Sequence, residues 1–484
     1  MLDKRNNSSY TISVDLLVNA ISGVNPDKPS LYQDAAEYFI NEPANKQNLT
    51  QLIAEIRDAK LLLEAQSGKN ADALRLQLEH LNKKYEVELL SQQTDSKRRL
   101  NNAIDVCMEI LSLSEGDNFE ETQLKSSKFL TSLVLFSPEK GKKLAELHHS
   151  LKPAYKAVLS LRLVDKLVAN GVVKNAYMLR NYDSDKRYVP DVTSHECYTQ
   201  SVILPIMLAA IFQDIGLQHP ALTELLTGKE GDKDRFRFLE KHERKEMLAL
   251  NYQYAFDYMK NGLGCQQSSS EEEHEIAEFN EAEQKRLKFQ LGLVLDANLS
   301  KLGTSEIIKI PQIYASVIFS TKRDYLRKNL PTASILIAQL AIKKQISPQV
   351  SDVFVNIVGQ FPLGFGVAYV AQDMSGNDLN FYEYAIVTRL NPPKTYLPIC
   401  RLVTKNLMFL PHGKTAVIKK EHNLHFPIAR KKLVKIDPKR LAGVMQNLSH
   451  NFRIVEGQSI VPSYWEPFEY FCVQGNQNLW GNST

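Results

Sequence analysis

Apolar residues that recur three and four positions apart between residues 46 and 180 constrain the fold of this chain most strongly. Three such series are Leu52, Ile56, Ala59 and Leu63; Leu74, Leu78, Leu81 and Tyr85; and Leu100, Ile104, Cys107 and Leu111. This spacing places each series on one face of an α-helix. The turn-forming stretch "SGKN" at 67–70 separates the first two series, so they are predicted to form an antiparallel helical hairpin.

The rest of the chain divides into two further regions by the same criterion. Helical periodicity continues over 151–358, interrupted by an acidic, serine-rich stretch at about 262–284 that is predicted to be a solvated, mobile insertion. After residue 359 the runs "GVAYVAQ", "YEYAIVTRL" and "LPICRLV" alternate as strands do. The predicted fold is therefore mainly α, with a helical N-terminal module (1–150), a helical bundle (151–358) and a small C-terminal β-sheet extension (359–484).

Composition restricts the class of protein. A formal net charge of +4 over 484 residues does not require a nucleic-acid partner, and none is predicted. The most apolar run, "SVILPIMLAAIF" at 201–212, is shorter than the roughly 20 residues that span a bilayer. The five scattered cysteines suit reduced thiols. We expect a cytoplasmic protein without membrane insertion.

Four segments together carry a resemblance. They are "AAIFQDIG" (209–216), "ASVIFSTKRDYLRKNLPTASILIAQL" (315–340), "ISPQVSDVFVNIVGQFPLGFGVAYV" (346–370) and "AIVTRLNPPKTYLPICRLV" (385–403). In this order they resemble the HD-GYP family, bacterial cyclic di-GMP phosphodiesterases of the HD phosphohydrolase superfamily. The resemblance implies a helical bundle in which histidines and carboxylates hold two metal ions that clamp the attacking and leaving oxygens of a phosphodiester.

At the positions that match the family's metal ligands, most residue types have changed. The matching positions are Gln213 and Asp214 for the His-Asp pair, His242, Leu291 and Gly292 for two paired histidines, Asp296, and Tyr314 for the last aspartate. A neutral amide is a poor ligand beside imidazole and carboxylate. The first ligand histidine has only His195 as a candidate, which lies closer to Gln213 than the family spacing. No metal, cofactor or catalytic residue is therefore predicted.

The surviving residues also have structural interpretations. Asp214 followed by Gly216 is typical of a helix end, and His242 lies in a charged stretch typical of a solvated helix. The family-like Arg323 and Arg327 could grip a phosphate without metal, or could pack and cap their helix. The pair His148-His149 is predicted on a helix surface, and the basic segment 428–440 is predicted to be a solvated face that could attract an acidic partner.

These observations favour a non-catalytic, HD-GYP-like regulatory or scaffold protein of bacterial signalling that binds a protein partner, either a homodimer or another chain. One alternative is an active phosphohydrolase with a reduced or relocated metal site at His195, Asp214, His242 and Asp296. The other is a metal-free cyclic dinucleotide receptor that uses Arg323 and Arg327; in the favoured interpretation cyclic di-GMP binding is weak or nil. The helical N-terminal module is predicted either to regulate or dimerise the protein, or to pack on its neighbour.

Overall fold

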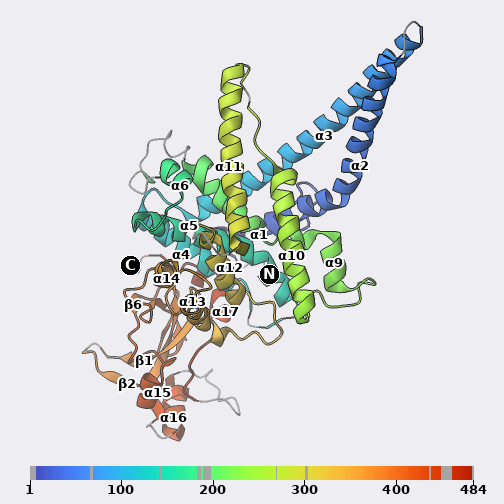
Figure 1. Ribbon diagram of the computed structural model, residues 1–484. Helices are drawn as coiled ribbons and strands as arrows, with labels where there is room; N and C mark the ends of the chain where they lie inside the picture. Colours follow the sequence, from blue (N-terminus) through green and yellow to red (C-terminus); the bar gives the residue numbers. More distant parts are fainter. Residues whose placement is uncertain are drawn as a thin grey trace. The chain divides into compact units, whose positions relative to one another are not determined.

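A computed structural model describes most of the chain and confirms a mainly helical protein with a small antiparallel sheet near the C-terminus (Figure 1). The described residues are 7–65, 69–138, 140–141, 143–182, 187–188, 198–268, 270–299, 304–373, 375–434, 438–448 and 460–481. The chain forms two compact units. The first unit contains 1–19, 107–211 and 292–484, and the second contains 20–106 and 212–291. Each unit thus draws on more than one of the regions expected from sequence.

In the described part of the second unit the regular elements are all helices. They are α2 (Leu31–Glu64), α3 (Lys69–Ser114, which the unit holds as far as Val106), η3 (Ile215–Gln218), α9 (Pro220–Thr227), α10 (Lys241–Asp257), η4 (Tyr258–Leu263) and the start of α11 (Glu273–Leu299). Ser30 begins α2 with a capping box, in which its side chain accepts from the Gln33 amide. The N-terminal end of α2 packs against η3, η4 and α9 through an aromatic cluster around Phe39 and Tyr258, whose ring centroids are 5.6 Å apart.

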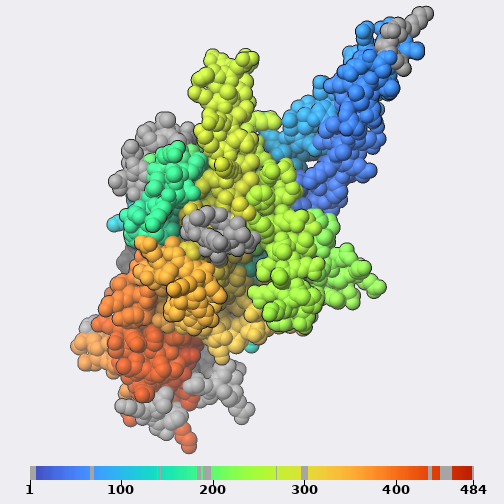
Figure 2. Space-filling model, viewed as in Figure 1, coloured from blue at the N-terminus to red at the C-terminus, as the bar shows by residue number. Residues whose placement is uncertain are grey.

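The predicted hairpin is present as α2 and α3, which run side by side in Figure 1. The inward residues are those of the predicted stripes: Ala59 and Leu81 are buried, and Leu52, Leu63 and Leu78 are half-buried. In Figure 2 the blue side chains fill the space between the two helices toward the tip.

Polar contacts close the opposite end of the hairpin. The Asp34 carboxylate is buried and accepts from Arg98 Nη1 at 2.5 Å and Asn102 Nδ2 at 2.7 Å. Charge-assisted hydrogen bonds of this kind fix the register of the two helices.

The acidic stretch at 262–284 differs from expectation. Its side chains from Glu271 onward are largely exposed, as predicted, but Glu273 begins helix α11. Glu283 anchors the preceding loop, since its Oε2 accepts from the Gln266 amide at 2.9 Å and from Arg286 Nη2 at 2.5 Å. Glutamate-rich sequence has good helix propensity, and this propensity outweighs its inability to bury apolar surface.

The first unit has a helical part centred on α5 (Leu144–Ala169), which is buried along most of its length. The other helices of this part are α1 (Ser9–Ser22), α4 (Phe119–Leu135), α6 (Ala176–Asn181), η2 (Thr199–Ile203), α8 (Leu204–Phe212), α12 (Glu306–Ile318), η5 (Arg327–Asn329), α13 (Thr332–Ile342) and α14 (Pro348–Val358). Helix α5 packs against α4, α12 and α14. No helix in the described part of the chain is both long enough and apolar enough to cross a membrane.

A buried charge cluster ties α5 to the segment before α4. The Glu115 carboxylate pairs with Arg162 of α5 and, at 2.6 Å, with Arg187. Arg162 also lies 2.9 Å from Asp165. Burial alone would raise the pKa of Glu115, but the two guanidinium groups outweigh it and lower that pKa. Glu115 is therefore ionised and held between two buried cations.

The C-terminal part of the first unit carries the sheet at the positions predicted from sequence. Its strands are β1 (Gly366–Gln372), β2 (Asp378–Val387), β3 (Ile399–Leu402) and β6 (Thr415–Val417), antiparallel in the order β1-β2-β3-β6, with a separate hairpin of β4 (Thr404–Lys405) and β5 (Met408–Phe409). After β6 the chain returns to β1, where Val370 donates to the His422 carbonyl and Leu424 donates to the Ala368 carbonyl, each at 2.9 Å. The four-stranded sheet and the segment 418–424 thus form a closed ring of hydrogen-bonded segments, which is called the C-terminal ring below.

One face of this ring is covered by helices. Ala368, Val370 and Tyr382 pack against apolar side chains of α15 (Pro427–Val434) and α16 (Pro438–Leu448). The final described elements are α17 (Phe468–Phe471) and η6 (Gln474–Asn476). Aromatic residues near the C-terminus dock on the core: Trp465 donates to the Ala385 carbonyl at 2.9 Å, and Tyr470 and Phe471 are buried.

Candidate functional site

The position that the resemblance matches to a His-Asp pair lies just after the buried helix α8. Gln213 and Asp214 form the turn that leads into η3, and the Gln213 carbonyl accepts from Asn251 Nδ2 of α10 at 3.1 Å. Gly216 lies in η3 rather than at a helix C-cap. A Cβ at this position would overlap the backbone carbonyl oxygen of Asn251, so glycine here permits the close approach of α10.

Around Asp214 the second unit places other polar groups. Burial raises the pKa of Tyr32, and the nearby Asp214 charge adds to this rise while Arg235 opposes it. Arg235 also donates to the Leu217 carbonyl at 2.9 Å. Asp214 is therefore part of an internal polar contact set of the second unit.

His242 lies on the first turn of α10 with an exposed side chain. The capping group of this helix end is Glu243, which pairs with Arg237 at 2.6 Å and accepts from the Glu240 amide at 2.9 Å. These hydrogen bonds, that of Arg237 first, lower the pKa of Glu243 to about 2. The neighbours of His242 thus stabilise the helix start, as the structural interpretation of this residue expects.

The other positions that the resemblance matches to metal ligands fall partly in each unit. Leu291 belongs to the second unit and Gly292 to the first, and both are half-buried positions of α11. Asp296 lies in the same helix, but its side chain falls outside the described residues, as does His195 entirely.

Tyr314 occupies the core of the first unit. It lies on α12, is 1% exposed, and its ring meets that of Phe354 edge to face with centroids 5.2 Å apart. Nearby, Lys156 of α5 is fully buried and donates to Gln312 Oε1 at 2.9 Å. The position that matches the family's last metal aspartate is therefore filled by an aromatic ring in close packing.

Arg323 and Arg327 do not share the helix that the resemblance implies, because α12 ends at Ile318: Arg323 lies in the following turn and Arg327 in η5. Arg323 is exposed, whereas Arg327 is fully buried in η5. The Arg327 guanidinium donates to the Ser137 carbonyl at 2.5 Å and lies 3.2 Å from the Glu466 carboxylate. These contacts are all within the protein, and they favour the packing role of Arg327 over phosphate binding.

The structure also bears on the predictions made for His148 and for the basic segment 428–440. His148 is not on a helix surface: it is fully buried, with Nδ1 2.7 Å from the Ser320 carbonyl oxygen, and burial lowers its pKa to about 4. The prediction is wrong because α5 is covered on nearly all sides.

Within the basic segment 428–440, Lys432 pairs with Asp378 of β2 at 2.5 Å and Arg430 donates to the Leu424 carbonyl at 3.2 Å. Part of this segment therefore makes contacts within the protein.

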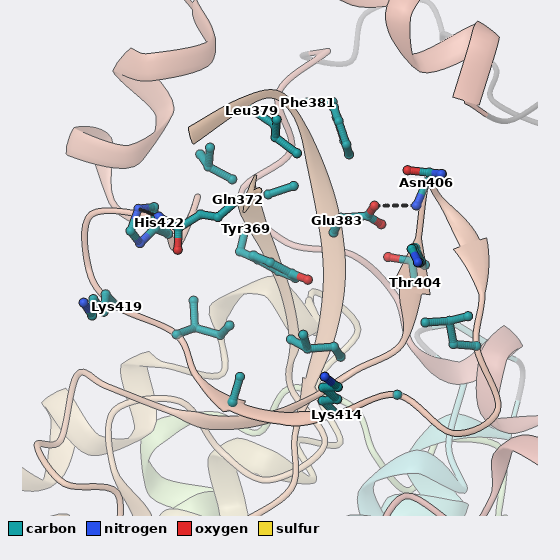
Figure 3. Close-up of a pocket in the computed structure, with 18 of the residues that line it drawn as sticks. Tyr369, Gln372, Leu379, Phe381, Glu383, Thr404, Asn406, Lys414, Lys419 and His422 are labelled. Atoms are coloured by element: carbon teal, nitrogen blue, oxygen red, sulfur yellow. Dashed lines mark hydrogen bonds between the residues drawn. The ribbon is translucent and has the colours of Figure 1, made fainter. Parts of the chain in front are cut away.

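Within the described residues no group of three or more histidine, cysteine, aspartate or glutamate side chains is arranged to hold a metal ion. The structure does contain a cavity of about 560 Å³, on the face of the ring opposite to α15 and α16 (Figure 3). Strand alternation explains its lining, because Tyr369 and Glu383 point into it while Val370 and Tyr382 point to the helices.

Glu383 is the buried carboxylate of this cavity, and it holds the β4–β5 turn. Asn406 and Leu407 both have positive φ, 53° and 59°, which is unfavourable for leucine. Their amides donate to the Glu383 oxygens at 2.6 and 3.2 Å. Burial raises the pKa of Glu383, and hydrogen bonds from Thr404 and the turn amides oppose this rise.

This cavity could not be identified from the sequence. Glu383 was within a predicted strand, and an acidic residue in an otherwise apolar strand was the available signal. That signal did not show which face would be left open, since this depends on where α15 and α16 pack.

No known family, characterised protein or solved structure gives a match to this chain.

Proposed function

We propose that this chain is a non-catalytic, HD-GYP-like regulatory or scaffold protein of the bacterial cytoplasm that acts by binding a protein partner. The observation that supports the proposal is that a position which the resemblance matches to a metal ligand carries a side chain that serves packing. Tyr314, at one of these positions, is an aromatic core residue. Substitutions of this kind remove charges whose burial would be unfavourable without a metal.

The loss of ligands bears directly on catalysis. Two-metal phosphodiester hydrolysis depends on ions that activate the nucleophile and stabilise the leaving oxygen. If most ligands are replaced, the whole contribution of the ions is removed, and transition-state stabilisation of many kcal/mol goes with it. The proposed protein therefore keeps the helical scaffold and its surfaces but does not hydrolyse cyclic di-GMP.

The α2–α3 hairpin supports the protein-binding part of the proposal. Near its tip Leu61, Leu62 and Leu76 are exposed, although the predicted stripes of both helices are turned inward. Exposed apolar side chains that gather on one element are typical of surfaces that bind another protein. The hairpin is the proposed contact for the partner, whether a second copy or another chain.

An assay of cyclic di-GMP hydrolysis tests the proposal. The full chain is incubated with cyclic di-GMP and added Mn²⁺ or Fe²⁺, beside an Asp214→Ala variant and a buffer blank. The expected result is the same background rate in all three. Turnover by the unmodified chain that disappears in Asp214→Ala would contradict the proposal and support the phosphohydrolase alternative.

Co-purification tests the hairpin contact. The tagged chain, expressed at its native level, is compared with a Leu62→Glu, Leu76→Glu double variant and with Gln77→Glu, which adds a charge at an exposed neighbour without removing an apolar group. We expect bound protein, a second copy included, to be lost only from the double variant. Retention of every bound protein by the double variant would contradict the proposed contact.

A further inference from the structure

The cavity of the C-terminal ring has the size and lining of a small-molecule site. Its volume of about 560 Å³ lies within the range of roughly 300 to 1,000 Å³ that is usual for ligand pockets. Apolar side chains form much of its wall: Leu379, Phe381, Leu402, Leu410 and Ile418. Burying these side chains against a ligand would be favourable because it removes apolar surface from water. The opposite face of the same strands is already covered by helices.

Some polar groups in the cavity already make hydrogen bonds within the protein, and others do not. The Glu383 carboxylate is occupied by the β4–β5 turn. The Tyr369 hydroxyl makes no hydrogen bond to any described residue, and burial raises the pKa of this phenol, so it is a neutral donor. Figure 3 shows the hydroxyl pointing into the cavity, toward the side that carries Glu383 and Lys414.

Charge also distinguishes the lining. Lys405, Lys414 and Lys419 line the cavity, and among the described residues none of the three has a carboxylate within ion-pair distance. By contrast, Asp378 just outside the cavity is paired with Lys432 at 2.5 Å and with His422 at 2.9 Å. Asp378 is thus already paired with cations, and the Glu383 carboxylate, which has no cation within ion-pair distance among the described residues, is held by the turn amides. The three lysines therefore leave the lining with an excess of positive charge.

We propose that this cavity binds a small organic anion, with an apolar body against the lining to which Phe381 and Ile418 contribute, a hydrogen bond from the Tyr369 hydroxyl, and an anionic group near Lys414. Three lining features each contribute one part of this ligand: an apolar enclosure, an unused donor and an unpaired cation. An uncharged ligand of the same shape would gain the enclosure but not the pairing with lysine.

Two fluorescent probes separate these contributions. The sulfonate 8-anilinonaphthalene-1-sulfonate and its uncharged analogue N-phenyl-1-naphthylamine share the aromatic body and differ in the anionic group. Each is titrated against the full chain and three variants. Lys414→Gln removes the cation, Ala416→Trp fills the cavity, and Lys343→Gln is the control at an exposed lysine outside the cavity.

We expect Lys414→Gln to weaken binding of the sulfonate by about three- to fivefold, the effect of one exposed ion pair. The same variant should change binding of the uncharged probe by less than about twofold. Ala416→Trp should abolish the saturable binding of both probes, and Lys343→Gln should change neither. Circular dichroism and melting curves establish that each variant is folded.

The proposal is overturned if Lys414→Gln leaves sulfonate binding unchanged, or if it weakens both probes equally. It is also overturned if a folded Ala416→Trp chain binds both probes as the unmodified chain does. Should Ala416→Trp fail to fold, the comparison of the two probes with Lys414→Gln still decides, because the Lys414 side chain is exposed and its loss leaves the core intact.

Discussion

Replacing Tyr314 by the aspartate that the HD-GYP resemblance places at this position should destabilise the protein rather than create a metal site. Tyr314 is 1% exposed and packs edge to face on Phe354. Loss of a buried aromatic ring is expected to lower the free energy of unfolding by about 3 to 5 kcal/mol. Tyr314→Phe keeps the ring, so its effect should stay within about 1 kcal/mol.

With aspartate at position 314 the free energy of unfolding also depends on pH, whereas with its uncharged isostere asparagine it does not. Burial would raise the pKa of the introduced carboxyl in the folded state above about 3.9, its ordinary value in the unfolded chain. The folded state then binds more protons, so stability falls as pH rises above that value, by about 1.4 kcal/mol per pH unit until the folded pKa is passed. Tyr314→Asn should show the packing loss without this slope.

Urea unfolding followed by circular dichroism at pH 5, 6 and 7 measures both parts. The expected result is a gap between Tyr314→Asp and Tyr314→Asn that widens as pH rises. Equal stability of Tyr314→Asp and Tyr314→Phe at every pH would refute the assignment of Tyr314 to a closed core. Tight, stoichiometric binding of Mn²⁺ or Fe²⁺ by Tyr314→Asp alone would refute the loss of the metal site.

The other predictions concern close packing, buried charge and nucleotide binding. Gly216→Ala should lower the free energy of unfolding by about 1 to 3 kcal/mol, because the added Cβ overlaps the Asn251 carbonyl oxygen. Gly292→Ala should be neutral or slightly stabilising, because no atom lies within 4 Å of the added Cβ. Thermal melts of the two variants check this. Glu115→Gln should lower the free energy of unfolding by about 3 kcal/mol at pH 7, since it removes one of the two carboxylates, the other being Asp165, that pair with the buried Arg162 and Arg187. The folded-state pKa of Glu115 is lowered, so the stability it contributes is present above about pH 4.5 and is lost as pH falls below that value; urea titrations from pH 7 to pH 3 should show the gap between wild type and variant closing. Calorimetry should show no binding of cyclic di-GMP at or below a dissociation constant of about 1 μM, and such binding, if abolished in Arg323→Ala, would identify a nucleotide receptor instead.

Helices and strands of this chain could be predicted from the sequence where the periodicity is strong. The stripes that contain Ala59 and Leu81 became the inner faces of the α2–α3 hairpin, and the run "GVAYVAQ" became β1 without change of bounds. These features depend on local spacing, which the sequence contains directly.

Features that depend on tertiary packing could not be predicted in this way. His148 lies in a polar-looking stretch, yet it is buried because α5 is covered on nearly all sides. The side of the sheet that stays open beside Tyr369 depends on where α15 and α16 dock, and neither position follows from strand alternation. Alternation shows which residues share a face, but not which face is covered.

Metal content tests the central claim most directly. The full chain is purified without chelators, loaded with Fe²⁺ or Mn²⁺, freed of excess ion by gel filtration and analysed for metal per chain, with Asp214→Ala beside it. The account predicts that neither protein retains iron or manganese in stoichiometric amount. One or more ions per unmodified chain, lost in Asp214→Ala, would contradict it and show that the His-Asp position still holds a metal.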